Sequence, residues 1–120
     1  GHITYKGDVK DVASLLNKTS VLILPTFYGE GLPKIICEAA SCGVPVIATD
    51  IPGCRQGIIA SVTGHLIKEV DAGYFSHQLV SLLGNKSALK NMSVAARQHA
   101  EVNFDVNVIT EKHFKIYAFG

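Results

Sequence analysis

Two carboxylates, Glu30 and Glu38, bracket a short segment that begins with Gly31 and has Pro33 near its centre. An ionised carboxylate only accepts hydrogen bonds, and it can take two O–H donors side by side, as a vicinal diol offers them. The segment between the acids predicts a helix start, whose free N–H groups and positive dipole end suit a diphosphate. The order acid, helix start, acid therefore matches the sugar, diphosphate and ribose of a nucleotide sugar.

The neighbouring elements place this segment at one edge of a sheet. Residues 20–24 form a continuous apolar run that Pro25 ends, which predicts a strand buried on both faces. Pro33 fits the first turn of a helix, which we expect to run to about residue 42 and to end at Gly43. Ligands of open α/β sheets bind beyond the carboxyl ends of the strands, where the loop 26–31 lies.

Strands and helices alternate along the rest of the chain. Further strands are predicted over residues 2–5, 45–49 and 62–68, with turn residues at 50–53, and a helix is predicted over 9–17. Three helical patterns follow, marked by these residues: Phe75, Leu79, Leu82 and Leu83; Leu89, Met92, Ala96 and Ala100; and, after Asp105, Ile109, Phe114 and Tyr117. The alternation predicts an α/β fold with a Rossmann-like parallel sheet and flanking helices.

Composition limits the classes of function. The chain has 120 residues, which favours one domain, and 48% of them are apolar and 18% charged, which is enough for a packed core. A formal net charge of +1 argues against a general nucleic-acid or anionic-membrane binder. No apolar run approaches the roughly 20 residues of a membrane-spanning helix, and no signal peptide is visible, so we expect a cytoplasmic protein.

The cysteines and histidines do not suggest a metal site. The three cysteines, Cys37, Cys42 and Cys54, lack paired zinc-ligand spacing, so we interpret them as small buried hydrophobes. The five histidines also lack such spacing, and we expect all of them at the surface: His2, His65, His77, His99 and His113. No metal is therefore expected.

The sequence around the two acids resembles glycosyltransferase family 4, also called glycosyl transferases group 1. Residues 21–50 carry the hallmark E-x(7)-E followed by EA-x-x-x-G-x-PVIAT. The resemblance continues through Pro52-Gly53-Cys54-Arg55 and Thr63-Gly64 and covers nearly the whole chain. It implies a GT-B fold in which residues 1–120 belong to the C-terminal, donor-binding domain. It also implies transfer with retention of configuration and no required metal or cofactor, because the nucleotide sugar is a substrate.

The resemblance also assigns roles to single residues. It implies that Glu30, the expected catalytic-site residue, contacts hydroxyls of the transferred sugar, and that Glu38 accepts from the ribose hydroxyls. Gly31 and Leu32 would offer backbone N–H groups to the donor, and Gly7 and Asp8 would lie near the base. The nucleotide-sugar-binding set expected on this basis is Gly7, Asp8, Glu30, Gly31, Leu32, Pro33, Lys34 and Glu38. Lys34 is either a phosphate ligand or a solubility residue.

The chain departs from the family pattern in several places. The first strand–loop–helix unit of the donor domain, with its diphosphate-neutralising Arg and Lys, is not found, nor is the N-terminal acceptor domain. Gln56 stands where a glutamate is common, and Arg55 fits either a surface salt bridge or a site role. We expect a fragment of a larger enzyme that has no transferase activity alone.

The function expected first is transfer of a hexose from a UDP-sugar to a glycan or lipid-linked acceptor in cell-surface polysaccharide synthesis. That enzyme would be cytoplasmic, at the inner face of the membrane, with its acceptor held by the other domain. The alternatives are a non-catalytic nucleotide-sugar-binding or interaction module and a UDP-sugar epimerase, which the E-x(7)-E string disfavours. Phe114 and Tyr117, on the expected last helix, would form an apolar patch through which the chain dimerises.

Overall fold

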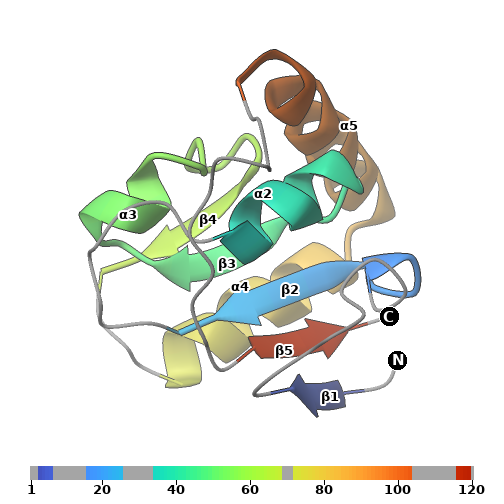
Figure 1. The fold of residues 1–120 in the computed structure, drawn as a ribbon. Helices are drawn as coiled ribbons and strands as arrows, with labels where there is room; N and C mark the ends of the chain where they lie inside the picture. Colours follow the sequence, from blue (N-terminus) through green and yellow to red (C-terminus); the bar gives the residue numbers. More distant parts are fainter. Residues whose placement is uncertain (1–2, 7–15, 26–33, 69–71, 104–115, 120) are drawn as a thin grey trace.

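A computed structural model of the chain describes residues 3–6, 16–25, 34–68, 72–103 and 116–119 (Figure 1). The helices and strands in these ranges are β1 (Ile3–Lys6), β2 (Val21–Leu24), α2 (Lys34–Ser41), β3 (Val46–Thr49), α3 (Pro52–Arg55), β4 (Gly64–Ile67), α4 (Ala72–Leu83), α5 (Lys86–Asn103) and β5 (Ile116–Phe119). The strands form one sheet in the order β1-β5-β2-β3-β4.

The parallel part of the sheet agrees with the prediction. Strands β2, β3 and β4 are mutually parallel, with Leu22 opposite Val46 and Ile47 opposite His65. Every residue of β2 and β3 is buried, because helices cover both faces, which explains why these strands read as uninterrupted apolar runs. The predicted Rossmann-like parallel sheet with flanking helices is thus confirmed.

The last element corrects the sequence-based prediction. Tyr117 was expected on a helix, but it lies in β5, which runs antiparallel to both of its neighbours and pairs Tyr117 with Tyr5 of β1 and Ile23 of β2. Apolar spacing over so short a segment cannot separate helix from strand. The β-branched and aromatic residues of β5 favour a strand, and its two neighbours offer backbone partners on both sides. Tyr117 therefore does not lie on an apolar helix face, where it had been expected. Phe114 lies outside the described residues.

Helices form a layer on each face of the sheet. Alternate side chains of the central strands point to opposite faces: Leu22 and Val46 join a core cluster with Ile36 of α2, while Ile23 and Ile47 join a cluster with Phe75 of α4. The short helix α3 contributes to the first cluster and α5 to the second. This is the two-faced burial expected of a doubly covered sheet.

Helix α5 links the two layers. Its first half carries Met92 into the cluster under α4, and Ala96 and Ala100 pack against Ala40 of α2. The hydroxyl of Ser93 donates to the carbonyl of Gly43, 2.5 Å away. Gly43 ends α2 with φ +70°, a backbone conformation that favours glycine. Because Gly43 lies just before β3, this contact holds α5 at the amino edge of the strands.

The remaining local predictions differ in detail. The stripe over Met92, Ala96 and Ala100 is buried as predicted, whereas Leu83, expected with the apolar face of α4, is exposed. The turn predicted over residues 50–53 contains the first half of the helical turn α3, whose first residue is Pro52. Among the helices that the structure describes, none combines the length and apolar character needed to cross a membrane.

Candidate functional site

The candidate site is the edge of the sheet where the parallel strands end. Strand β2 ends at Leu24 and is followed by Pro25, β3 ends at Thr49, and β4 ends at Ile67. These strands run in the same direction, so their carboxyl ends lie along one edge (Figure 1). Helix α2, which follows β2 in the chain, begins on this side of the sheet, as ligand sites of open α/β sheets require.

Two of the predicted site residues lie in the described part of the chain, namely Lys34 and Glu38. Lys34 begins α2 and Glu38 follows one turn later, so both occupy one face of the helix, with Nζ and Oε1 3.9 Å apart. Their side chains are 32% and 23% exposed. The other predicted residues lie outside the described residues: Gly7, Asp8, Glu30, Gly31, Leu32 and Pro33.

The Lys34–Glu38 pair resolves an electrostatic difficulty of the site. A carboxylate close to a diphosphate-binding helix start would repel the ligand if its charge stood alone. The ammonium of Lys34, in the first turn of the helix, lies 3.9 Å from the Glu38 carboxylate and partly balances its charge. A pair one turn apart on the surface of a helix contributes only about 0.3–0.5 kcal/mol, so a ligand can separate the two groups at little cost.

The apolar face of α2 sets the direction of these two side chains. Ile36, Cys37 and Ala40 are buried against the rest of the molecule, which leaves Lys34 and Glu38 on the partly exposed side. Burial raises the pKa of the Cys37 thiol to about 12, with a smaller contribution from the charge of Glu38. Cys37 is therefore a neutral packing residue, although it adjoins Glu38 in the sequence.

The prediction of buried cysteines is confirmed at two positions and wrong at the third. Cys54, like Cys37, is buried, and desolvation followed by the charge of Asp50 raises the pKa of its thiol to about 11. Cys42 is exposed. It follows the last residue of α2, where the chain turns toward Gly43, so the apolar helix pattern no longer determines its environment.

Arg55 and Asp50 form an ion pair near the carboxyl end of β3. The guanidinium Nε donates to Asp50 Oδ1 at 2.5 Å, and Nη2 donates to the Asp50 carbonyl at 3.4 Å. The Asp50 amide in turn donates to the carbonyl of Ile67 at 2.7 Å, which ties the ends of β3 and β4 together. Of the two interpretations of Arg55, the surface salt bridge is the one that the structure confirms.

The histidines are not all at the surface. His77 is exposed on α4 as predicted, but His65 is half-buried on β4, opposite Ile47, and His99 is half-buried on α5. Desolvation lowers the pKa of His65. His65 lies in the middle of β4, whose pairing with β3 partly covers it, and this pairing was not recognised from the sequence. His2 and His113 lie outside the described residues. Within the ranges described, no three His, Cys, Asp or Glu side chains gather as metal ligands.

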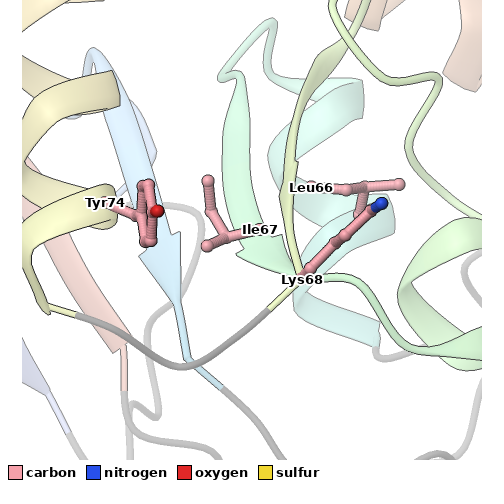
Figure 2. Close-up of a pocket in the computed structure, with 4 residues that line it drawn as sticks. All are labelled: Leu66, Ile67, Lys68 and Tyr74. Atoms are coloured by element: carbon pink, nitrogen blue, oxygen red, sulfur yellow. The ribbon is translucent and has the colours of Figure 1, made fainter.

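A pocket at the end of β4 was not anticipated from the sequence (Figure 2). Its described lining residues are Leu66, Ile67 and Lys68 at the strand end and Tyr74 in the first turn of α4, and its volume is about 380 Å³. The signal in the sequence was an aromatic residue, Tyr74, shortly after a lysine, Lys68, at the end of a predicted strand. The pocket lies along the same carboxyl edge as the start of α2.

Comparison with known proteins identifies the family. The sequence profile described as glycosyl transferases group 1 matches residues 1–85. The N,N'-diacetylbacillosaminyl-diphospho-undecaprenol alpha-1,3-N-acetylgalactosaminyltransferase of Campylobacter jejuni is 30% identical over 117 residues, which are 98% of this chain and 31% of that protein. The phosphatidyl-myo-inositol mannosyltransferase of Mycobacterium leprae is 30% identical over 118 residues, 97% of this chain and 31% of that protein. The chain thus spans about a third of the length of these relatives.

Solved structures show the same fold. Anabaena Alr3699/HepE in complex with UDP-glucose superposes with a TM-score of 0.76 at 20% identity, over 82% of this chain and 27% of that one. The C-terminal domain of the glycosyl transferase group 1 protein LpcC from Francisella tularensis gives a TM-score of 0.57 at 17% identity, over 67% of this chain and 42% of that one. The chain therefore belongs to the glycosyl transferases group 1 family and shares the Rossmann-like fold of these solved structures.

Proposed function

We propose that residues 1–120 form the nucleotide-sugar-binding part of the C-terminal domain of a retaining glycosyltransferase. The observation that carries the proposal is the start of α2 at the carboxyl edge, where Lys34 and Glu38 lie side by side on one partly exposed helix face. In this family, such a helix start with an acid one turn later suits a diphosphate joined to a ribose diol.

Each group would have a separate part in binding the donor. The first turn of α2 offers backbone N–H groups and its positive dipole end to the diphosphate. Lys34 turns from Glu38 toward the phosphates, and Glu38, released from the ion pair, accepts from the ribose hydroxyls. Glu30, with Gly31, Leu32 and Pro33, contacts the transferred sugar and its phosphate. Gly7 and Asp8 lie near the base.

The names of the relatives and structural neighbours indicate the class of donor and acceptor. One structural neighbour was solved with UDP-glucose, and relatives are named as transferases of N-acetylgalactosamine and mannose and as a capsular polysaccharide enzyme. These names favour a UDP-sugar donor and hexosyl transfer to a glycan or lipid-linked acceptor in cell-surface polysaccharide synthesis. The reaction would need no metal or cofactor and would take place on the cytoplasmic side of a membrane.

Replacing Glu38 tests the ribose assignment. In Glu38→Ala, UDP loses hydrogen bonds to a charged acceptor, which costs on the order of 1.5–3 kcal/mol of binding free energy. Calorimetric titration with UDP measures the change. Glu101→Ala is the matched control, because Glu101 also pairs with a cation one turn away, Arg97, but on the exposed side of α5. Equal UDP affinity of Glu38→Ala and the unaltered protein would remove Glu38 from the donor site.

Replacing Glu30 should affect sugar transfer and UDP binding to different extents. Because its partner is the sugar, Glu30→Ala in the enzyme that carries this domain lowers the rate of sugar transfer more than it lowers the affinity for UDP. Initial rates and UDP titrations on the same variant provide both quantities. A loss of UDP affinity as large as that of Glu38→Ala would contradict this division. If the enzyme with Glu30 intact binds UDP but transfers sugar to no acceptor, the non-catalytic nucleotide-sugar-binding module is favoured.

A further inference from the structure

The pocket between the end of β4 and the start of α4 has the composition of a ligand site. Its volume of about 380 Å³ falls within the range of roughly 300–1,000 Å³ that small-molecule sites occupy. Two of its described walls are aliphatic, Leu66 and Ile67, one is aromatic, Tyr74, and one carries a charge, Lys68. Figure 2 shows Tyr74 projecting from α4 and Lys68 from the strand end, with Ile67 between them.

The exposure of Tyr74 is not explained by the packing of α4. That helix buries Phe75, Leu79 and Leu82 against the sheet, whereas Tyr74, beside them, is 59% exposed. An exposed aromatic ring at the mouth of a pocket is typical of binding surfaces, because the ring offers an apolar face and a polar hydroxyl together. The ammonium of Lys68 adds three hydrogen-bond donors.

The ring of Tyr74 and the side chain of Ile67, which points toward it in Figure 2, match the apolar face of a pyranose ring, because the C–H bonds of a hexose pack on an aromatic or aliphatic wall. Lys68 extends from the strand end away from Tyr74, where its ammonium would donate to hydroxyls at the edge of the sugar ring. We propose that the pocket lined by Leu66, Ile67, Lys68 and Tyr74 binds a hexose unit of the acceptor glycan. This inference rests on the proposed glycosyltransferase function, and it gives this chain a direct contact with the acceptor in addition to those of the other domain.

The order of the strands favours the acceptor over the nucleotide. The proposed function assigns the base to Gly7 and Asp8, which come directly after β1 in the sequence, and β1 lies on the other side of β2 from the pocket. The pocket lies at β4, the opposite edge strand, two strands beyond β2 and next to the Asp50–Ile67 hydrogen bond. A donor whose diphosphate lies at the start of α2 and whose base lies toward β1 leaves the β4 side for a second sugar.

Nuclear magnetic resonance of the 120-residue chain tests the proposal with methyl α-D-glucopyranoside as the probe. We expect this glucoside to shift the amide signals of Leu66, Ile67, Lys68 and Tyr74. Tyr74→Ala should weaken the glucoside affinity by about fivefold or more, because the stacking wall is lost, and Tyr74→Phe should keep it within about twofold. Val80→Ala, which removes a 69% exposed side chain of the same helix outside the pocket lining, should leave the affinity unchanged.

Three kinds of result in this titration would overturn the proposal. The first is a missing or non-specific response to the glucoside, either no shifts at the pocket or an affinity that Tyr74→Ala leaves unchanged. The second is a larger response of the pocket signals to uridine, which would make it a base site. The third is an equal response to inorganic phosphate, which would make it an anion site governed by Lys68.

A parallel titration with UDP separates this inference from the proposed function. UDP should shift the signals of Lys34 and Glu38, at the start of α2. If UDP shifts them and the glucoside leaves the pocket unaffected, only the acceptor pocket is refuted. If the glucoside binds at Tyr74 and UDP binds nowhere, the donor-binding function fails and the acceptor assignment, which depends on it, fails as well.

Discussion

The thiols of this protein differ in environment, and their reactivity should follow that difference. The pKa values of about 12 for Cys37 and about 11 for Cys54 keep both thiols protonated at neutral pH, and both are buried. A thiol needs its thiolate and an open path to react. We therefore expect an aromatic disulfide reagent at about pH 8 to modify only Cys42 in the folded chain.

Counting the released chromophore checks this prediction. All three cysteines should react once the chain is unfolded in denaturant, and Cys42→Ser should abolish the fast reaction of the folded protein. Rapid modification of a second thiol under native conditions would show that Cys37 or Cys54 is accessible.

His65 should make the stability of the fold depend on mild acid. Burial lowers its pKa below the ordinary value of 6.5, so the unfolded chain binds this proton more tightly than the folded chain does. The free energy of unfolding therefore falls as the pH drops through about 6.5, and it continues to fall until the pH is below the pKa of the folded state.

The variant His65→Gln should reduce this dependence. Urea unfolding at about pH 7.5 and about pH 5.5 gives the slope, and the exposed His77→Gln serves as the control on α4. The comparison is one of slopes, so a constant loss of stability in the variant does not affect it. Identical pH dependence in His65→Gln and the unaltered protein would contradict the effect of burial.

Among the elements, β4 depends on a glycine for its pairing. A Cβ atom on Gly64 would overlap the carbonyl oxygen of Val46, its partner residue in β3. That oxygen belongs to the backbone of β3, and the backbone of β4 fixes the position of the Cβ, so the overlap is relieved only by separating the strands. We expect Gly64→Ala to lower the free energy of unfolding by about 1–3 kcal/mol, measured by urea denaturation.

Gly84→Ala provides the matched comparison. Gly84 follows the end of α4, and the nearest contact of an added Cβ is the Val80 carbonyl oxygen at 3.2 Å. Its substitution should change stability by less than about 1 kcal/mol, in either direction. Equal effects at the two glycines would show that the strand contact does not constrain β4.

For the whole molecule, the two helical layers predict where the fold is most resistant to opening. All residues of β2 and β3 are buried between the layers, whereas β4 is an edge strand with two partly exposed residues. Amides of β2 and β3 should exchange with solvent only through global unfolding, and those of β4 through smaller openings. Native-state hydrogen exchange at increasing denaturant distinguishes the two, and slower exchange in β4 than in β3 would contradict the layered core.

The sequence alone was sufficient to predict the central strand–helix–strand unit, formed by β2, α2 and β3. The apolar runs of β2 and β3 must be buried on both faces, and Gly43 ends the helix between them by its local backbone preference. The pairing of Lys34 with Glu38 was not predicted, although helical spacing determines which side chains are neighbours.

Tertiary structure decided the features that depend on distant parts of the chain. The strand β5 lies antiparallel between β1 and β2, a pairing that no local pattern specifies, and its residues had been interpreted as helix. The pocket at Tyr74 and the tie between Asp50 and Ile67 exist only because β4 ends beside β3 and α4 begins there. Local spacing governs contacts within one element, but contacts between elements follow from the packing of the whole sheet.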